Sequence, residues 1–245
     1  MSTAATRANV AALIPCYYEE KQIREIATRT RVQLDTVLVV DDGSVDKTSD
    51  EARAAGVEVI KHERNQGKGA AIKTGLRELT SRAGVEWVLI LDGDGQHLPE
   101  EIPHFFEEAN RTGAEMIVGS RMDDTRKMPF VRKLTNLTMS GLISSIIGQR
   151  VPDSQCGFRM FRRDLAAAFL DVQSSNFDFE SEMLVIAARR GVKIGAAKVS
   201  TVYGDEVSKI HPVRDTIRFI KLLRRLRRET RSTSSAPGPS SPAGT

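Results

Sequence analysis

Short apolar runs alternate with amphipathic segments through the first half of the chain, and this alternation limits the possible folds more than any other feature. The apolar runs are rich in Val, Ile and Leu, and the segments between them repeat apolar residues at helical spacing. The expected strands are residues 10–14, 36–40, 57–60, 88–91 and 116–118, and the expected helices are residues 19–32, 45–55, 67–82 and 98–109. This order predicts an α/β fold with a mainly parallel central sheet and helices on both faces.

The second half is less regular and ends in two segments of distinct composition. We expect helices at residues 131–147 and 179–190, a strand at residues 157–161 and an extended segment at residues 192–202. Residues 213–230 combine apolar residues at helical spacing with many Arg and Lys residues, which predicts a basic amphipathic helix. Residues 231–245 are almost all Ser, Thr, Pro, Gly and Ala, a composition typical of disorder. The predicted organisation is a domain at 1–212, the helix and the tail.

The composition argues against a disulfide-rich or zinc-binding protein, a membrane-spanning protein and a nucleic-acid-binding protein. Cys16 and Cys156 supply neither a disulfide framework nor a zinc-site spacing, which favours a reducing, cytoplasmic compartment. No apolar run approaches the roughly 18–20 residues that a membrane span needs. Residues 213–231 hold eight Lys/Arg and two acids, so this segment carries +6 and the rest about −2 of the total +4. We therefore expect a cytoplasmic protein that does not bind nucleic acid.

Two carboxylates and an amide directly follow the buried strand at residues 88–91. The strand runs into the turn Asp92-Gly93-Asp94-Gly95-Gln96. Open α/β sheets bind ligands at the carboxyl ends of their strands. Oxygen ligands without thiols suit Mg²⁺ or Mn²⁺, which proteins usually hold with one or two carboxylates and substrate phosphates. The turn therefore predicts a metal–diphosphate site, although such a sequence is also ordinary turn chemistry.

Other strand ends in the first half also carry polar residues. One strand leads into Pro15-Cys16-Tyr17-Tyr18-Glu19 and the next into Asp41-Asp42-Gly43-Ser44. Ser44 or Asp46 could be a simple helix cap. Residues 65–71, NQGKGAA, begin a helix with glycines and Lys68, and exposed amides at a helix N-terminus suit phosphate. This segment lacks the spacing of a Walker A motif.

The same motifs occur together in a specific order. They are IPCYYEE, VVDDGSVDKT, NQGKGAAIKTG, LDGDGQHLPEEI, VGSR, DSQCGFRMF, FDFESEML and VSKIHPVRD, and they cover about residues 9–220. In this order the chain resembles the family-two glycosyltransferases with a GT-A fold, in particular the branch of dolichyl- and polyprenyl-phosphate mannosyl- and glucosyltransferases. The resemblance implies a catalytic domain at residues 1–212. It also implies metal-dependent, inverting transfer of a hexose from a GDP-mannose- or UDP-glucose-type donor to a polyprenyl phosphate.

The resemblance also implies roles for individual residues. Those implied for nucleotide-sugar binding are Pro15, Tyr17, Glu19, Asp41, Asp42, Lys68 and Asp92, with the choice between Asp41 and Asp42 for the base or ribose left open. The residues implied for metal binding are Asp92, Asp94 and Gln96. The residues implied for contact with a phosphate or with the acceptor are Arg121, Arg159 and Lys209. The candidate catalytic residues are Asp94, Arg121, Asp153 and Glu180. Tyr18 stands where the family usually has Asn, Lys209 stands where a histidine is expected, and a surface salt bridge is the alternative for Arg159.

The implied chemistry depends on the acceptor. The diphosphate leaving group gains negative charge, which a metal ion neutralises. A phosphate acceptor is already anionic, whereas a hydroxyl acceptor needs a general base, for which Asp153 and Glu180 are the candidates. The alternatives are a soluble sugar or protein acceptor, a nucleotide-sugar-binding protein without turnover, and a nucleotidyltransferase. The helix at 213–230 predicts peripheral contact with the cytoplasmic membrane face or, alternatively, docking on the catalytic domain.

Overall fold

The computed structural model describes residues 3–122, 128, 130–172 and 178–200. All of them belong to one compact unit, Met1–Glu206. The second unit, Val207–Thr245, lies outside the described residues. Lys209, the basic helix expected at residues 213–230 and the tail expected at residues 231–245 therefore lie outside them too.

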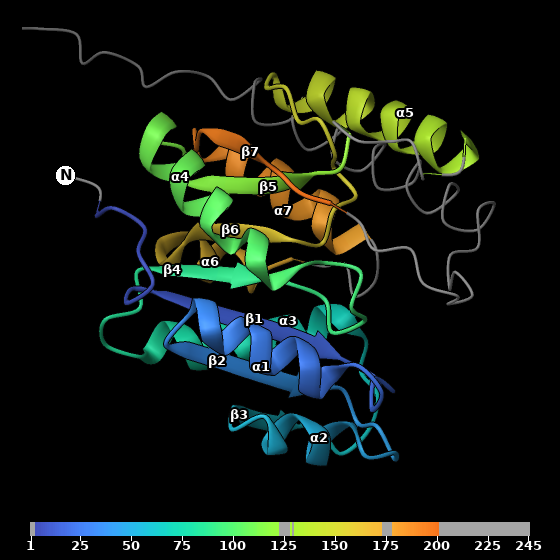
Figure 1. Cartoon of the computed structure of the whole chain (residues 1–245). Helices are drawn as coiled ribbons and strands as arrows, with labels where there is room; N and C mark the ends of the chain where they lie inside the picture. Colours follow the sequence, from blue (N-terminus) through green and yellow to red (C-terminus); the bar gives the residue numbers. More distant parts are fainter. Residues whose placement is uncertain (1–2, 123–127, 129, 173–177, 201–245) are drawn as a thin grey trace, which may run out of the picture. The chain divides into compact units, whose positions relative to one another are not determined.

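A seven-stranded sheet with the order β3-β2-β1-β4-β6-β5-β7 forms the centre of this unit (Figure 1). The strands are β1 (Val10–Cys16), β2 (Thr36–Asp41), β3 (Glu58–Lys61), β4 (Trp87–Ile90), β5 (Met116–Ser120), β6 (Arg159–Arg162) and β7 (Ile194–Lys198). Among these described strands, β6 alone runs opposite to the others, because it pairs antiparallel with both β4 and β5. The expected α/β architecture with a mainly parallel sheet is confirmed.

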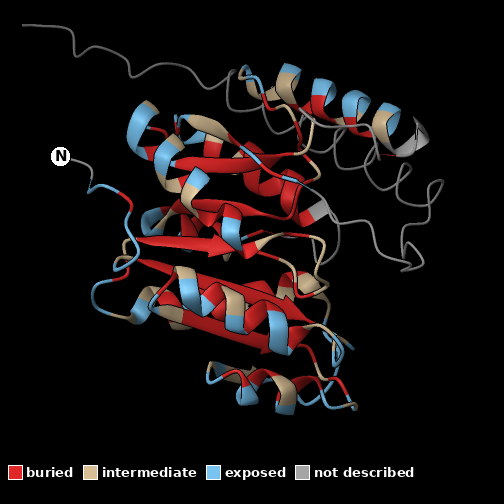
Figure 2. Cartoon of the chain, viewed as in Figure 1, coloured by how far each residue is buried: buried red, intermediate tan, exposed pale blue. Residues whose placement is uncertain are grey.

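Helices cover both faces of the sheet. They are α1 (Ile23–Gln33), α2 (Thr48–Ala54), α3 (Lys68–Ser81), the 3₁₀ helix η1 (Pro99–Glu101), α4 (Ile102–Thr112), α5 (Phe130–Ile147), α6 (Arg163–Phe169) and α7 (Asp178–Arg189). In Figure 1, α1 and α4 lie in front of the sheet and α3, α6 and α7 lie behind it. The inner strands of the sheet are mainly buried, the two edge strands β3 and β7 are more exposed, and the outer sides of the helices are exposed (Figure 2). This is the pattern expected for a mainly parallel sheet between two helical layers.

The packing of α3 on β1 brings the first residue of the helix to the sheet edge. A Cβ atom on Gly75 would lie 2.1 Å from Cδ1 of Leu13, so only glycine lets the helix backbone approach the strand this closely. The buried face of α3 continues through Ala71, Ile72, Leu76 and Leu79. This contact places Lys68, at the start of α3, beside the carboxyl ends of the strands.

Several element boundaries differ from the expectation. The helix expected at residues 45–55 begins at Thr48, because Asp46 Oδ1 accepts hydrogen bonds from the backbone N and the hydroxyl of Thr48 and so forms a turn before it. The strand expected at residues 157–161 begins only at Arg159, whose side chain bonds the carbonyls of the preceding loop. Helix α6 was not expected, because its seven residues are too few for a clear helical period.

No helix among the described residues combines the length and the apolar character needed to cross a membrane.

Candidate functional site

The carboxyl ends of β1, β2 and β4 lie at one edge of the sheet, on the right-hand side of Figure 1. From β1 the chain builds the sheet in one direction through β2 and β3, and then returns to place β4 on the other side of β1. The sheet therefore has a topological switch point between β1 and β4, where open α/β sheets form their ligand crevice. The turn that begins at Asp92 leaves β4 at this point.

Three charged side chains from distant parts of the chain meet beside the switch point. Lys68 Nζ lies 2.8 Å from Asp92 Oδ1 and 2.7 Å from Glu180 Oε1. Glu180 is in the first turn of α7, and its second oxygen, Oε2, is buried without a hydrogen-bond partner among the described residues. The cluster thus brings together two residues implied for nucleotide-sugar binding, Lys68 and Asp92, and the candidate catalytic residue Glu180.

The pKa values in this cluster follow from burial and charge together. Burial by itself lowers the pKa of Lys68, but the carboxylates of Asp92 and Glu180 raise it well above its usual range. Burial by itself raises the pKa of Asp92, but nearby cationic groups, with Lys68 foremost, bring it below its usual value. The cluster is therefore ionic, with two carboxylates around one ammonium group.

The turn after β4 requires its glycines. Asp94 Oδ1 accepts a hydrogen bond of 3.0 Å from the backbone N of Gln96 and so closes the turn. Gly95 has φ +74°, and a Cβ there would also lie 2.4 Å from Oε1 of Gln22. From the other side, a Cβ on Gly157 would lie 2.6 Å from Oδ2 of Asp92, so the backbone at residue 157 packs directly against that carboxylate.

The donor set on this turn fits a divalent cation only together with a ligand. Within the described part of the chain, no three His, Cys, Asp or Glu side chains converge to hold an ion. Two aspartates with an adjacent amide are instead the partial set that Mg²⁺ or Mn²⁺ completes with phosphate oxygens and water. The carboxylates of Asp92, Asp94 and Glu180 carry a formal charge of about −2 after pairing with Lys68, which a divalent cation would balance.

Asp41 is buried at the end of β2, and its carboxylate organises the following loop. Oδ1 accepts hydrogen bonds from the backbone N of Ser44 at 2.9 Å and from the Ser44 hydroxyl, and Oδ2 accepts one from the hydroxyl of Ser49. Both carboxylate oxygens are therefore used by donors of the protein. Contact between Asp41 and a nucleotide stays a prediction.

Asp42 is also buried and organises the loop before α3. Its Oδ2 accepts a hydrogen bond of 2.7 Å from the backbone N of Gly67, and its Oδ1 accepts one of 3.0 Å from that of Gln66. His62 Nδ1 lies 2.7 Å from the same Oδ1, and His62 Nε2 lies 2.9 Å from the Thr74 hydroxyl. Sequence reasoning missed His62, because a lone histidine after a strand carries no signal of its partner. The Asp42–His62 pair fixes the loop that leads to Lys68.

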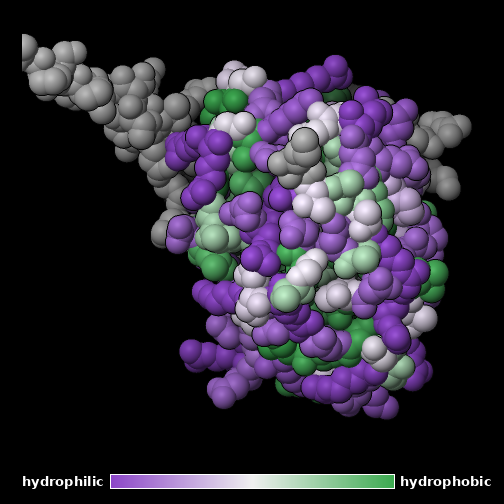
Figure 3. Space-filling view, turned by 90° about the vertical axis from the view of Figure 1, so that its left-hand side faces the viewer, coloured by the Kyte–Doolittle hydropathy of each residue, from purple (hydrophilic) through white to green (hydrophobic). Residues whose placement is uncertain are grey.

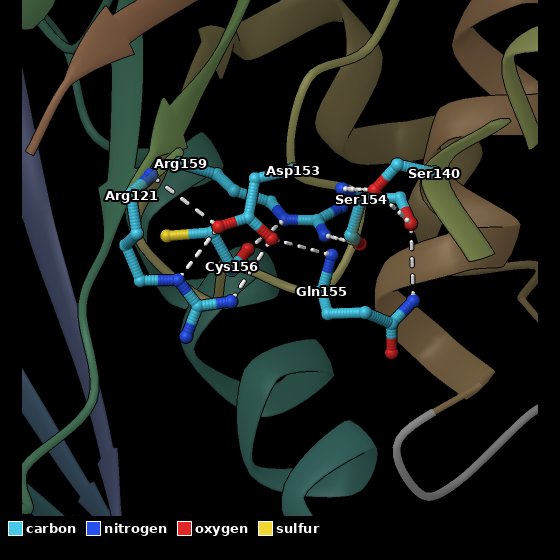
Figure 4. A network of polar contacts seen from close by, with 7 residues as sticks. All are labelled: Arg121, Ser140, Asp153, Ser154, Gln155, Cys156 and Arg159. Carbon is cyan, nitrogen blue, oxygen red and sulfur yellow. Dashed lines mark hydrogen bonds and ion pairs between the residues drawn. The ribbon is translucent and has the colours of Figure 1, made fainter. Parts of the chain in front are cut away.

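Arg121 and Asp153 form a two-pronged ion pair on the β5 side of the site (Figure 4). Arg121 Nε donates to Asp153 Oδ2 at 2.6 Å, and an Nη donates to Oδ1 at 2.9 Å. Asp153 is completely buried. Both oxygens of the Asp153 carboxylate face the guanidinium of Arg121, so the pair holds the Arg121 side chain in place. The catalytic roles implied for Arg121 and Asp153 stay predictions.

Arg159 is buried close to this pair (Figure 4). Its Nε donates to the carbonyl oxygen of Cys156 at 2.8 Å, one Nη donates to that of Ser154 at 2.7 Å, and the other Nη donates to that of Glu180. The alternative of a surface salt bridge is therefore wrong. Arg159 instead ties the loop before β6 to the first turn of α7, and its predicted phosphate contact stays untested.

The loop after β1 carries the remaining residues assigned to the nucleotide. Pro15 is buried within β1, whereas Tyr17 and Tyr18 expose their rings at the sheet edge. The backbone N of Glu19 donates a hydrogen bond of 2.9 Å to the Thr48 hydroxyl. The loop is thus fastened to the start of α2.

His97, one residue after Gln96, is a buried histidine that the sequence did not assign to the site. Burial lowers its pKa to about 4, so the imidazole is neutral at pH 7. Its ring lies 5.2 Å from that of Phe158, centre to centre, and its Nδ1 has no hydrogen-bond partner among the described residues. His97 is therefore a buried, uncharged side chain that packs against Phe158, directly after the turn that carries Asp94.

Comparison with known proteins identifies the family. Residues 11–170 match Glycosyl transferase family 2. The chain is 30% identical over 213 residues to a UDP-N-acetylglucosamine–dolichyl-phosphate N-acetylglucosaminyltransferase of Methanococcus voltae, covering 78% of this chain and 84% of that protein. It is 34% identical over 205 residues to an undecaprenyl-phosphate mannosyltransferase of Micrococcus luteus, covering 79% and 83%.

Solved structures show the same fold. Glucosyl-3-phosphoglycerate synthase from Mycobacterium tuberculosis, in complex with Mn²⁺, UDP and glucosyl-3-phosphoglycerate, matches with a TM-score of 0.65 at 17% identity. The match covers 94% of this chain and 81% of that chain. The GT-A fold expected from the sequence motifs is confirmed. The chain belongs to glycosyl transferase family 2, and the protein is a glycosyltransferase with a GT-A fold.

Proposed function

We propose that this glycosyltransferase moves a hexose from a nucleoside-diphosphate sugar to a polyprenyl phosphate, with divalent-metal assistance and inversion at the sugar. The observation that carries the proposal is the Lys68–Asp92–Glu180 cluster beside the Asp94 turn at the switch point of the sheet. It combines acidic oxygens for a cation with an ammonium group for a phosphate. The acceptor class is supported by the relatives that act on dolichyl and undecaprenyl phosphates.

The residues of the cluster and of the adjacent Asp94 turn have distinct parts in the proposal. Asp92 and Asp94 would hold Mg²⁺ or Mn²⁺, with Gln96 on the same turn. When bound, such an ion neutralises the charge that develops on the departing diphosphate. Lys68 would donate to the diphosphate from the other side, and Glu180 would keep the Lys68 side chain in place through their 2.7 Å ion pair.

The accessibility of the acids favours a phosphate acceptor. A hydroxyl acceptor needs a general base that can be reached, but Asp153 is completely buried and paired with Arg121, and Glu180 is paired with Lys68. A phosphate monoester is anionic near neutral pH and attacks without such a base. Arg121 would then bind the acceptor phosphate while Asp153 holds the plane of its guanidinium, since a planar guanidinium suits phosphate oxygens.

Helix α5 supports a lipid as the carrier of that phosphate. Leu134, Leu137 and Leu142 are exposed by 55%, 49% and 37% on one side of the helix. No charged residue occurs between positions 134 and 147. The opposite side of α5 contacts the segment around Asp153, through the 2.8 Å hydrogen bond from the backbone N of Ser154 to the Ser140 hydroxyl. An apolar chain would thus have an uncharged surface next to the proposed acceptor side.

The face at the amino ends of the central strands has a different character. It is mainly hydrophilic, with only smaller apolar patches between polar side chains (Figure 3). The asymmetry supports a peripheral location in which the enzyme approaches the cytoplasmic side of a membrane with its α5 side. The basic segment at residues 213–230 would add charge attraction to anionic lipid.

The decisive experiment supplies purified enzyme with Mg²⁺ or Mn²⁺, a panel of nucleoside-diphosphate sugars, and either polyprenyl phosphate or soluble sugars. We expect a lipid-linked sugar and one released nucleoside diphosphate per transfer. Transfer only to soluble sugars would show that the acceptor is a soluble sugar and not a polyprenyl phosphate. Pyrophosphate released from a nucleoside triphosphate would instead indicate a nucleotidyltransferase.

A further inference from the structure

At the switch point, the β1 side and the β5 side of the sheet edge differ in chemistry. The carboxylates of Asp92 and Asp94 lie at its centre, at the end of β4. On the β5 side follows the charged pair Arg121–Asp153. On the β1 side follow two exposed aromatic rings, those of Tyr17 and Tyr18. A nucleoside diphosphate whose phosphates lie at the centre has a flat, uncharged nucleobase. The exposed rings on the β1 side are a surface on which such a base could lie.

The two tyrosines form one aromatic surface. Their ring centres are 4.5 Å apart and the ring planes are inclined by 68°, an edge-to-face arrangement. Tyr17 is exposed by 37% and Tyr18 by 46%. Large aromatic side chains gain most of their stabilisation from burial, so a pair of rings left in solvent at a ligand-binding edge indicates a surface that a ligand covers.

The backbone of Tyr18 is strained. Among the described residues it is the only non-glycine with a positive φ, +58°. For an L-residue with a bulky side chain this left-handed conformation is costly, whereas Asn and Gly adopt it readily. Strain of this kind persists where the surrounding structure enforces it, and it concentrates at functional sites.

Hydrogen bonds from the neighbouring loop enforce this conformation. The backbone N of Tyr18 donates to the Ser44 hydroxyl at 2.9 Å, and the next backbone N, of Glu19, donates to the Thr48 hydroxyl at 2.9 Å. Ser44 is itself held by the buried carboxylate of Asp41. The loop would keep this shape with Asn at position 18, so the shape does not explain the tyrosine. What tyrosine adds at this position is an exposed ring beside that of Tyr17.

We propose that the Tyr18 ring stacks on the nucleobase of the donor and extends the aromatic surface of Tyr17. This inference rests on the proposed nucleoside-diphosphate donor and assigns the residue that grips its base. The acids beside the rings, Asp41 and Asp42, already accept hydrogen bonds from the protein through all four of their oxygens. The ring would contact the flat face of the base, and such stacking tolerates different bases.

The experiment measures the binding of UDP, GDP and inorganic pyrophosphate to the full-length protein in the presence of Mn²⁺ by isothermal titration calorimetry. The variants are Tyr18→Asn, which removes the ring and suits the backbone, and Tyr18→Phe, which keeps the ring. We expect Tyr18→Asn to weaken binding of the better nucleotide by roughly 5- to 150-fold, the range for loss of one base–aromatic stack. Tyr18→Phe should bind within about twofold of the wild type, because the π-face is unchanged.

Two further readouts separate stacking from a general defect. Relief of the left-handed strain should raise the melting temperature of Tyr18→Asn by about 2–4 °C, even though nucleotide binding falls. Pyrophosphate, which has no base, should bind the wild type and Tyr18→Asn equally. Val45→Asn is the matched control, because Val45 is exposed by 85% in the adjacent loop and should leave nucleotide binding unchanged.

The outcomes distinguish this inference from the function on which it rests. If the wild type binds UDP or GDP and Tyr18→Asn binds it equally well, the stacking role is overturned while the proposed donor class stands. The stacking role is likewise overturned if Tyr18→Asn loses pyrophosphate binding in equal measure. If the wild type binds neither nucleotide, the proposed donor itself is overturned together with the role of Tyr18.

Discussion

Lys68 Nζ lies 2.8 Å from Oδ1 of Asp92, so a carboxylate proposed to hold a metal ion is already paired with a cation of the protein. The same ammonium group is held by Glu180 at 2.7 Å. In the proposed function, a metal ion at Asp92 would compete with Lys68 for the negative charge of that carboxylate. We therefore expect cation binding to weaken the Lys68–Asp92 contact and to leave Lys68, still held by Glu180, available to a phosphate.

Replacing Lys68 should separate metal binding from catalysis. Lys68→Met removes a positive charge at contact distance from Asp92, which is worth about 1–4 kcal/mol between aqueous and protein-like dielectric conditions. We expect affinity for Mn²⁺ without donor to rise by roughly tenfold, whereas sugar transfer falls. Titration of the protein with Mn²⁺, followed by electron paramagnetic resonance, measures the first effect. Lys61→Met, at an exposed position of β3, is the control, and unchanged Mn²⁺ affinity in Lys68→Met would refute the competition.

Asp94→Asn should abolish metal-dependent turnover without unfolding the turn. The amide oxygen of Asn can still accept the hydrogen bond from the backbone N of Gln96, so only the charge is removed. We expect a melting temperature close to that of the wild type, loss of Mn²⁺ binding by calorimetry and strongly reduced transfer. Wild-type transfer rates in this variant at saturating metal would show that Asp94 is not a ligand.

Gly157→Ala should damage the site through a single methyl group. The new Cβ would lie 2.6 Å from Oδ2 of Asp92, so the carboxylate must move away from its position beside Lys68. Turnover and Mn²⁺ affinity should both fall. Gly141→Ala is the matched control in α5, because nothing lies within 4 Å of its Cβ, and the alanine should stabilise the helix by up to about 1 kcal/mol. Equal activity of the two variants would contradict the role assigned to the Gly157–Asp92 contact.

Arg121→Lys tests whether this arginine acts beyond its pair with Asp153. Lysine keeps the charge but cannot form both bonds to the buried carboxylate, so stability should fall by about 1.5–3 kcal/mol, the value of one charge-assisted hydrogen bond. If Arg121 also binds the acceptor phosphate, the KM for polyprenyl phosphate should rise as well. Thermal unfolding and steady-state kinetics measure the two effects separately. A lower melting temperature with an unchanged KM would assign Arg121 to structure alone.

The basic segment at residues 213–230 lies outside the described residues, and its membrane role stays a prediction. We expect the full-length protein to bind vesicles that contain anionic lipid and to release them as salt increases, because each Lys or Arg near the surface contributes about 1 kcal/mol. Changing Arg224, Arg225, Arg227 and Arg228 to Gln should weaken binding in a vesicle sedimentation assay. Absence of wild-type binding at low salt would favour the soluble-acceptor alternative.

The sequence alone was sufficient for the features that depend on near neighbours in the chain. The β-branched runs, the helical spacing of α3 and the glycine-containing turn after β4 arise from local sterics and from burial on one or two faces. A mainly parallel sheet follows from the alternation of such elements, and the position of Asp92 and Asp94 at a strand end follows from the same pattern. The order of the motifs was also sufficient to indicate the family.

Only the tertiary structure decided which charged groups meet. Lys68 and Glu180 are 112 residues apart, and no local pattern specifies that the start of α3 and the first turn of α7 face the same carboxylate. The antiparallel β6, inserted between β4 and β5, brings Gly157 against Asp92 and buries Arg159. The carboxylates of Asp41 and Asp42 hold their loops because backbone N–H groups and hydroxyls of the folded chain lie within hydrogen-bond distance of them. Ion pairs and hydrogen bonds depend on distance in space, and the packing of the sheet sets that distance.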